Sequence, residues 1–175
     1  MNHILTNCTT DPVRIIWPLA QNLWPHNPEL WPNISLGLIL AGGNIITLED
    51  DDHDQSENED EDSNERAKIR SIKQGKDCLL QILITEFTHL IWVLRCDQVI
   101  NNHTHTLSEI RARWLKVINA RLTDDKIIAT KICWGKLSHS LVQDTWEKAL
   151  KMEAHIPWDW MYYWEVLVSR RVHTT

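Results

Sequence analysis

The first residues of the chain that could bind a metal ion are His3 and Cys8, in an H-x4-C arrangement. A structural zinc ion requires four nitrogen or sulfur ligands in a tetrahedron, and this pair supplies two of them. The further candidates His26, Cys78 and Cys96 have no recognisable zinc-ligand spacing relative to the pair. The sequence therefore favours an incomplete zinc site, with no complete metal centre and no cofactor.

Residues of catalytic type also lack their usual context. Two-metal catalysis needs carboxylates that hold two ions rigidly about 4 Å apart. Asp50 to Asp52 lack the aromatic-x-Asp-Asp strand context of a polymerase. Cys96 and Cys133 have no His at a recognisable spacing, and Ser138 to Ser140 has no Gly elbow. We therefore expect no catalytic residues and no enzymatic activity.

Two more histidines, His103 and His105, alternate in a segment that follows Asn101 and Asn102 and has the composition of a turn. A pair of histidines in a turn is more often solvated than bound to a metal. We therefore expect both imidazoles to be exposed to solvent.

Cationic side chains gather between Leu107 and Lys136, where seven Lys or Arg residues accompany three carboxylates. Several cations that contact phosphate give strongly salt-dependent binding to RNA or DNA. An ordinary solvated helix face has the same composition, so both interpretations are open at this stage. The candidate nucleic-acid-binding residues are Arg111, Arg113, Lys116, Arg121, Lys126 and Lys131.

The formal net charge of −6 conceals two parts of opposite charge. Eleven carboxylates and no Lys or Arg lie between Glu49 and Glu65, and outside this run 13 acidic side chains face 18 basic ones. The negative charges in residues 47–66 repel one another, and this segment has little apolar surface to bury. It is therefore predicted to form a disordered acidic linker. By mimicking phosphate, this acidic run could compete for the cations in cis.

The elements that must position these residues read as helices, and no segment alternates as a strand would. Thr10 can cap a first helix, in which Pro18 is expected to cause a kink or an early end. Ser35 to Leu40 suggests a short second helix. Glu65 to Asn101 contains no Pro and reads as one long helix or two in series. Its central part, Leu79 to Leu94, is apolar on all sides, which indicates a buried helix that is too short and too polar to span a bilayer.

Four more helices are expected in the C-terminal half. Thr106 and Glu109 form a capping box, and the helix that follows has an apolar stripe. Thr123 can cap a separate helix that runs to Lys131. Residues 137–150 mark another helix, and Trp160 to Arg171 a last short one. We therefore predict an all-α protein, a small irregular helical bundle at 67–175 joined through the linker at 47–66 to a Trp/Pro-rich helical block at 1–46.

Ten tryptophans are unusual for a chain of this length. Trp24, Trp31, Trp158 and Trp160 flank prolines or lie in predicted loops. They could stack on bases or form a protein interface, or they could cap the helical core from the side. The core-capping interpretation is favoured.

Several motifs resemble the region after the ribonuclease H domain in fungal non-LTR retrotransposon reverse transcriptases. His3 to Cys8 (HILTNC), followed by Trp17, is similar to the closing half of the zinc-binding module of that family. The upstream Cys pair of the module is missing, and the acidic run is the main other departure. Further similar stretches follow in order at Asn22–His26, Trp31–Gly37, Glu86–Arg95, Glu109–Thr130 and Glu165–Arg170.

The resemblance implies a non-catalytic accessory tail of a polyprotein, which lacks the polymerase and ribonuclease H catalytic residues and helps to hold RNA or DNA. The alternative is a helical module that binds a protein partner or self-associates without nucleic acid. The start of the chain has no basic region followed by an apolar run and a cleavage site. We therefore expect an intracellular protein, cytoplasmic or nuclear, that is neither secreted nor bound to a membrane.

Overall fold

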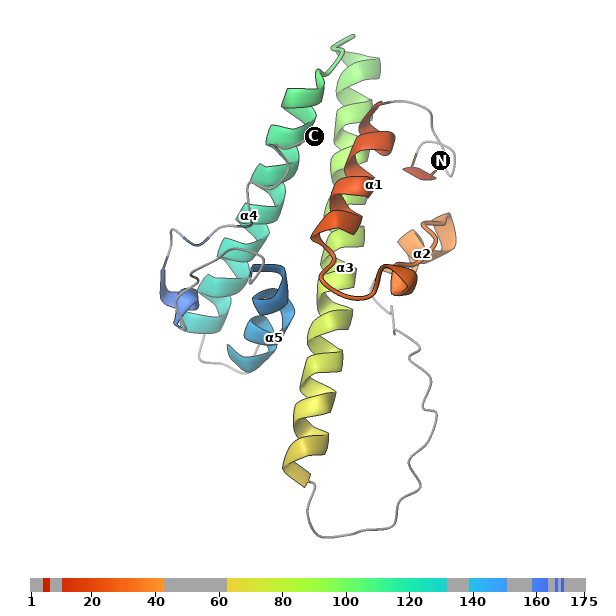
Figure 1. Ribbon diagram of the computed structural model, residues 1–175. Coiled ribbons are helices and arrows are strands. Elements are labelled where there is room, and N and C mark those ends of the chain that lie inside the picture. The colour runs from red at the N-terminus through yellow and green to blue at the C-terminus, as the bar shows by residue number, and fades with distance from the viewer. Residues whose placement is uncertain are drawn as a thin grey trace.

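The computed structural model describes residues 5–6, 11–42, 63–131, 139–150, 159–163, 166 and 168. Within these ranges every regular element is helical, which confirms the all-α prediction (Figure 1). Five α-helices are α1 (Asp11–Leu23), α2 (Leu36–Leu40), α3 (Ser63–Ile100), α4 (Leu107–Lys131) and α5 (His139–Leu150). Two 3-10 turns, η2 (Pro28–Leu30) and η3 (Trp160–Tyr162), complete the described part.

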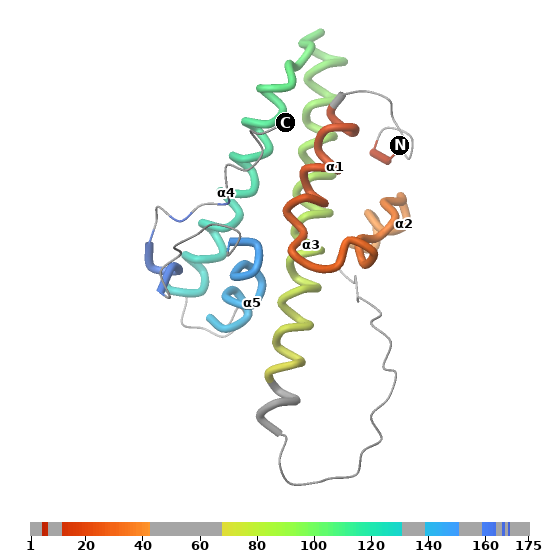
Figure 2. Tube along the Cα trace, viewed as in Figure 1, coloured from red at the N-terminus to blue at the C-terminus, as the bar shows by residue number. Residues whose placement is uncertain are grey.

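The helix α3 is the axis of the molecule and contacts each of the other four α-helices. It is a single helix of 38 residues, and the part predicted to be buried supplies nine fully or nearly fully buried apolar side chains between Leu79 and Leu94. Figure 2 shows that α4 runs antiparallel to α3 along the C-terminal half of α3. The helix α1 packs against both of them, and α5 lies beside the N-terminal half of α3. The apolar-all-round pattern therefore correctly indicated the central helix.

By length and composition alone α3 could cross a membrane. An 18-residue window within Lys68–Ile100 has a mean hydropathy of 1.4, and half of that window is buried inside the protein. The core helix of a globular bundle meets the same two criteria. The sequence analysis judged Leu79 to Leu94 too short and too polar to span a bilayer. The helix that contains this stretch is longer, and it meets the criteria of length and composition.

The helix α1 continues through Pro18 to Leu23, so Pro18 does not end it early. Pro18 is exposed, whereas Ile16, Leu19 and Ala20 beside it are buried in the core. Packing of these side chains offsets the hydrogen bond that a proline removes from a helix. The predicted cap at Thr10 lies outside the described residues, and so do the ligand candidates His3 and Cys8.

The helix α4 starts with the predicted capping box. The backbone N–H of Thr106 donates to Glu109 Oε2 at 2.7 Å, and the backbone N–H of Glu109 donates to Thr106 Oγ1 at 3.3 Å. The prediction that Thr123 starts a separate helix is wrong, because α4 is continuous to Lys131. The Thr123 hydroxyl donates to the carbonyl of Asn119 at 2.8 Å instead of capping a new helix. Ser35 does cap α2, by accepting from the backbone N–H of Leu38 at 3.2 Å.

The predicted helix from Trp160 to Arg171 is wrong for the residues described there. Only η3 is helical, and Tyr163 after it is extended. Side chains of α4 bind this backbone in place of helical hydrogen bonds. Lys126 Nζ donates to the carbonyls of Tyr163 and Val166, and Asn119 Oδ1 accepts from the backbone N–H of Val168 at 2.7 Å.

The helices α3 and α5 meet at Gly75. A Cβ atom at this position would lie 2.7 Å from the carbonyl carbon and the Cβ of Asp144, so only glycine allows this approach. The Ser71 hydroxyl donates to the carboxylate of Asp144 one turn away. The α5 side chains Val142, Trp146, Ala149 and Leu150 are buried, as the predicted stripe requires.

Of the four tryptophans expected to cap the core, the three that the structure describes do so. Trp24 and Trp160 are buried, and Trp31 lies edge-on to Trp24 at a centroid distance of 5.9 Å. Trp158 lies outside the described residues. The range predicted as linker is described only from Ser63 onward, where its last residues belong to α3.

Candidate functional site

The structure separates the six cations that the sequence grouped as nucleic-acid-binding residues. Arg121 donates to Glu86 Oε1 at 3.2 Å and to Asp125 Oδ1 at 3.0 Å, so it joins α4 to α3. Burial acts to lower the pKa of Arg121, but Asp125 and Glu86 together outweigh it and raise that pKa. Arg121 is therefore a structural cation that is engaged inside the bundle.

Two more of the six are engaged as well. Lys126 is buried, holds the carbonyls of Tyr163 and Val166, and lies 5.9 Å above the ring of Trp160. Burial lowers the pKa of Lys126. Arg113 Nη2 lies 3.3 Å from Asp97 Oδ2 on α3. Of the other three, Lys116 is exposed, Arg111 is half-buried, and the side chain of Lys131 lies outside the described residues.

The sequence analysis missed a second group of cations, which lies on the N-terminal turns of α3. Lys68 and Arg70 are exposed and Lys73 is half-buried. In Figure 1 these turns extend beyond α5. The sequence signal for this group was the K-x-R-x-x-K pattern directly after the acidic run. In a count of net charge, the carboxylates of the acidic run cancel these cations.

Most described carboxylates have partners inside the protein. Glu86, Asp97, Glu109, Asp125 and Asp144 all accept hydrogen bonds from other side chains or from the backbone. Within the described part of the chain, the carboxylates without a partner are Glu29, Asp124 and Asp159, whereas the unpaired cations are Arg14, Lys68, Arg70, Lys73, Arg111, Lys116 and Lys148. Among the described residues, unpaired positive charge therefore exceeds unpaired negative charge.

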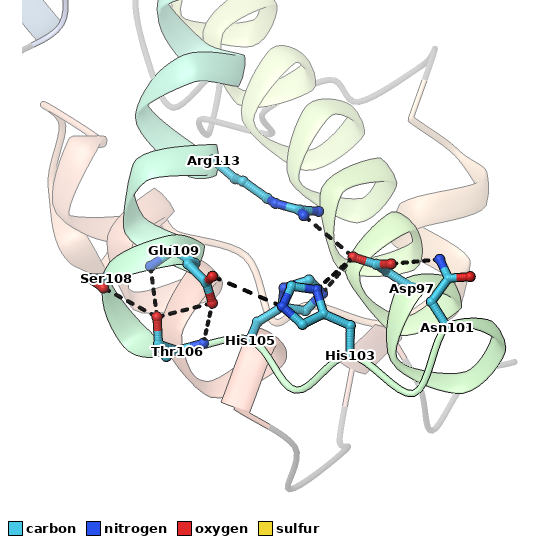
Figure 3. Close-up of polar contacts among 8 residues, drawn as sticks. All are labelled: Asp97, Asn101, His103, His105, Thr106, Ser108, Glu109 and Arg113. Atoms are coloured by element: carbon cyan, nitrogen blue, oxygen red, sulfur yellow. Dashed lines mark hydrogen bonds and ion pairs between the residues drawn. The ribbon is translucent and has the colours of Figure 1, made fainter.

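A second polar centre lies at the tip of the hairpin formed by α3 and α4 (Figure 3). The turn is set by Asn102, which has a φ of 52° in the left-handed region that Asn tolerates better than most residues. The backbone N–H groups of Asn101 and His103 both return to the carbonyl of Asp97, at 3.0 and 3.5 Å. This local geometry brings the His-x-His segment back beside the last turns of α3.

Both histidines converge on one carboxylate oxygen. His103 Nδ1 lies 3.3 Å and His105 Nε2 lies 3.2 Å from Asp97 Oδ2, and the two ring centroids are 4.4 Å apart. The other oxygen, Oδ1, accepts from Asn101 Nδ2 at 2.7 Å. The hydrogen bonds from Asn101 and then His103 hold the pKa of Asp97 at about 2, so the carboxylate is ionised at neutral pH.

The two imidazoles differ sharply in exposure. The side chain of His103 is 45% exposed, as expected for a solvated histidine, but that of His105 is only 2% exposed, so the expectation is wrong for His105. Among the described residues, no group forms a hydrogen bond with either ring nitrogen of His105, and the approach of Nε2 to Asp97 lacks hydrogen-bond geometry. A buried polar group without a hydrogen bond costs about 1–3 kcal/mol. His105 is therefore a buried imidazole without a hydrogen bond, and its Nε2 lies close to a carboxylate oxygen.

Glu109 connects the capping box to this centre. Its Oε2 accepts from the backbone of Thr106, a bond that lowers the pKa of Glu109. Its Oε1 lies 4.0 Å from His103 Nε2 (Figure 3). The capping box therefore fixes a carboxylate on the far side of the His103 ring from Asp97.

A hollow of about 210 Å³ lies between α3, α4 and α5 and includes Cys78, Arg121 and Asp125 in its lining. Burial, and then the nearby Asp77 and Asp125, raise the pKa of the Cys78 thiol. A thiol with a raised pKa is a poor nucleophile at neutral pH. The arrangement around Cys78 is therefore that of a structural thiol next to the Arg121 ion pairs.

Comparisons with known proteins found no relative of this chain. No protein-family model matches the chain, and neither a curated protein nor a solved structure matches it.

Proposed function

We propose that the chain is a non-catalytic helical accessory segment that contacts RNA or DNA through its unpaired cations. The observation that carries this proposal is that most described carboxylates are paired inside the protein, whereas Lys68, Arg70 and Lys73 on α3 have no partner among the described residues. The role agrees with the resemblance to the tail of a retrotransposon reverse transcriptase polyprotein. Arg111 and Lys116 on α4 are the remaining members of the original group that are available to phosphate.

The proposed contact is to the phosphate backbone. Arg70 and Lys73 are three residues apart and therefore neighbours on one helix face, whereas Lys68, two residues before Arg70, lies on a different side of the helix. Long cationic side chains on an exposed helix can follow phosphates without reading bases. We therefore expect binding with little sequence preference and with strong dependence on salt.

The experiment measures fluorescence anisotropy of labelled single-stranded RNA and duplex DNA with the full chain at increasing salt. Each phosphate contact contributes about 0.7 to the log–log salt slope for single strands and about 0.9 for duplex DNA. The triple variant Lys68→Ala, Arg70→Ala, Lys73→Ala should therefore lower the slope by about 2–3 and weaken binding at low salt by at least about tenfold.

The matched control is the double variant Arg14→Ala, Lys148→Ala, which removes exposed, unpaired cations from α1 and α5. It should retain most of the affinity. No binding at low salt, or the same loss in control and triple variant, would discard a phosphate-binding face on α3.

Replacing the carboxylates between Glu49 and Asp62 by Asn and Gln should strengthen binding if the acidic run competes in cis.

A second candidate function, a module for a protein partner or for self-association, is favoured by an apolar face on α3. Trp92, Val93, Val99 and Ile100 are exposed on its C-terminal half. Trp92 and Val99 are seven residues apart and share one helix face, as in helix-in-groove recognition. Light scattering that shows a concentration-dependent mass, lost in Trp92→Gln with Val99→Gln, would support this alternative.

A further inference from the structure

We propose that Asp97, His103 and His105 form a binding site for one divalent transition-metal ion of the zinc class. The ligand atoms are Asp97 Oδ2, His103 Nδ1 and His105 Nε2, and all lie within 4.8 Å of one another. Two imidazoles and one carboxylate suit Zn²⁺, Co²⁺ or Ni²⁺ better than Mg²⁺ or Ca²⁺, which prefer oxygen ligands. This inference does not rest on nucleic-acid binding.

Two of the three distances between the ligand atoms at the hairpin tip match those of a metal site. Zinc bonds of about 2.0–2.1 Å in a tetrahedron place neighbouring ligand atoms about 3.3–3.4 Å apart. The two nitrogen–oxygen distances here are 3.3 and 3.2 Å. The ion therefore requires only small side-chain adjustments, mainly of the exposed His103.

His105 supplies the second, independent observation. Its ring is buried, and among the described residues no hydrogen bond satisfies its nitrogens. Its Nε2 lies 3.2 Å from Asp97 Oδ2 without forming a hydrogen bond. A metal ion between these two atoms would satisfy the buried nitrogen and the carboxylate oxygen together.

Both flexible ligands already have outer-shell partners. Asn101 Nδ2 holds Asp97 Oδ1 at 2.7 Å, which leaves Oδ2 for the ion. His103 Nε2 lies 4.0 Å from Glu109 Oε1, so Nδ1 faces the ion while the far nitrogen faces a carboxylate. Such carboxylate–histidine–metal arrangements orient the imidazole and raise its basicity.

Arg113 opposes metal binding. Its Nη2 lies 3.3 Å from the same Asp97 oxygen, so the guanidinium must move away when an ion binds. The side chain is 39% exposed and can rotate toward solvent. Removal of this competing cation should therefore strengthen metal binding, an effect opposite to that of removing a ligand.

The bound ion would connect the last turns of α3 to the segment that leads into α4. With three protein ligands and an exposed His103, the fourth position is left to water. The site would therefore stabilise the hairpin tip. Its stabilisation should grow with the metal concentration, because the ion binds the folded chain.

The experiment titrates Zn²⁺ into the metal-free full chain by calorimetry and follows Co²⁺ by visible absorption. We expect one equivalent of Zn²⁺ to bind, a Co²⁺ spectrum of four-coordinate type, and a rise in melting temperature with Zn²⁺. His103→Ala and Asp97→Asn should each weaken Zn²⁺ binding at least about tenfold, and Asn101→Ala about tenfold. Arg113→Gln should strengthen it.

Controls separate this site from other histidines and from the motif at the start of the chain. His89→Ala and His139→Ala change exposed histidines elsewhere and should leave Zn²⁺ affinity unchanged. Cys8→Ser should also leave it unchanged. His103 is exposed, so its alanine variant should stay folded even if His105→Ala does not. Absence of Zn²⁺ binding, or full binding in both Asp97→Asn and His103→Ala, would overturn the proposal.

Discussion

The two ends of α3 carry charged side chains and use them in opposite ways. At the N-terminal end, Lys68, Arg70 and Lys73 have no partner among the described residues. At the C-terminal end, Asp97 has Asn101, both histidines and Arg113 around it. The cations at the N-terminal end could therefore meet a ligand directly, whereas a ligand of Asp97 must compete with partners that the fold already provides.

The largest expected effect in this comparison comes from Gly75, which sets the packing of the N-terminal half. Gly75→Ala places a methyl group 2.7 Å from backbone and side-chain atoms of Asp144, so α3 and α5 must separate. Overpacking of this kind costs about 1–3 kcal/mol, against about 1 kcal/mol gained from helix propensity. We expect a net loss of stability, measured by urea unfolding.

Gly37→Ala is the control for this substitution. The nearest atom to a Cβ at Gly37 is Ser35 Oγ at 3.8 Å, an ordinary contact. This variant should be as stable as the parent chain or slightly more stable. Equal stability of the Gly75→Ala chain and its parent would show that the close approach of α3 to α5 is wrong.

A smaller effect is expected at the C-terminal end of α3, where the capping box fixes the start of α4. Thr106→Ala removes the hydroxyl that accepts from the backbone N–H of Glu109. Loss of an N-cap costs about 1 kcal/mol. Ser108→Ala is the matched control, because among the described residues the Ser108 hydroxyl forms a hydrogen bond only with that of Thr106. Chemical denaturation should distinguish the two variants, and identical curves would argue against the cap.

The smallest effect on stability is expected from the cations at the N-terminal end. The triple variant Lys68→Ala, Arg70→Ala, Lys73→Ala removes no described ion pair, so unfolding free energy should change by no more than about 0.5 kcal/mol. A large loss of stability in thermal unfolding would mean that these side chains have structural partners. They would then not be free for phosphate.

Much of the fold could be predicted because its signals are local. The Thr106 capping box, the Ser35 cap and the apolar surface of α3 each depend on residues within a few turns. The errors arose where tertiary contacts override local preference. Thr123 resembles a cap but lies inside α4, and the backbone after Trp160 is held by Lys126 and Asn119 instead of forming a helix.

The candidate sites were harder to predict, because a charged residue does not carry its partner in the sequence. Arg121 lies 35 positions from Glu86 and could not be recognised as engaged without the packing of α4 on α3. The histidine pair was visible, but Asp97 joins it only because Asn102 reverses the chain in a left-handed conformation. Sequence patterns therefore identified some of the candidates, and the fold decided which residues meet.

The unbroken length of α3 has a consequence for how two ligands would affect each other. Lys73 and Asp97 are 24 positions apart in one helix, which corresponds to about 36 Å along its axis. At physiological ionic strength, electrostatic interactions are screened over about 8 Å. An ion at the hairpin tip would therefore have almost no electrostatic interaction with a phosphate at the other end of α3. The two binding free energies should be additive.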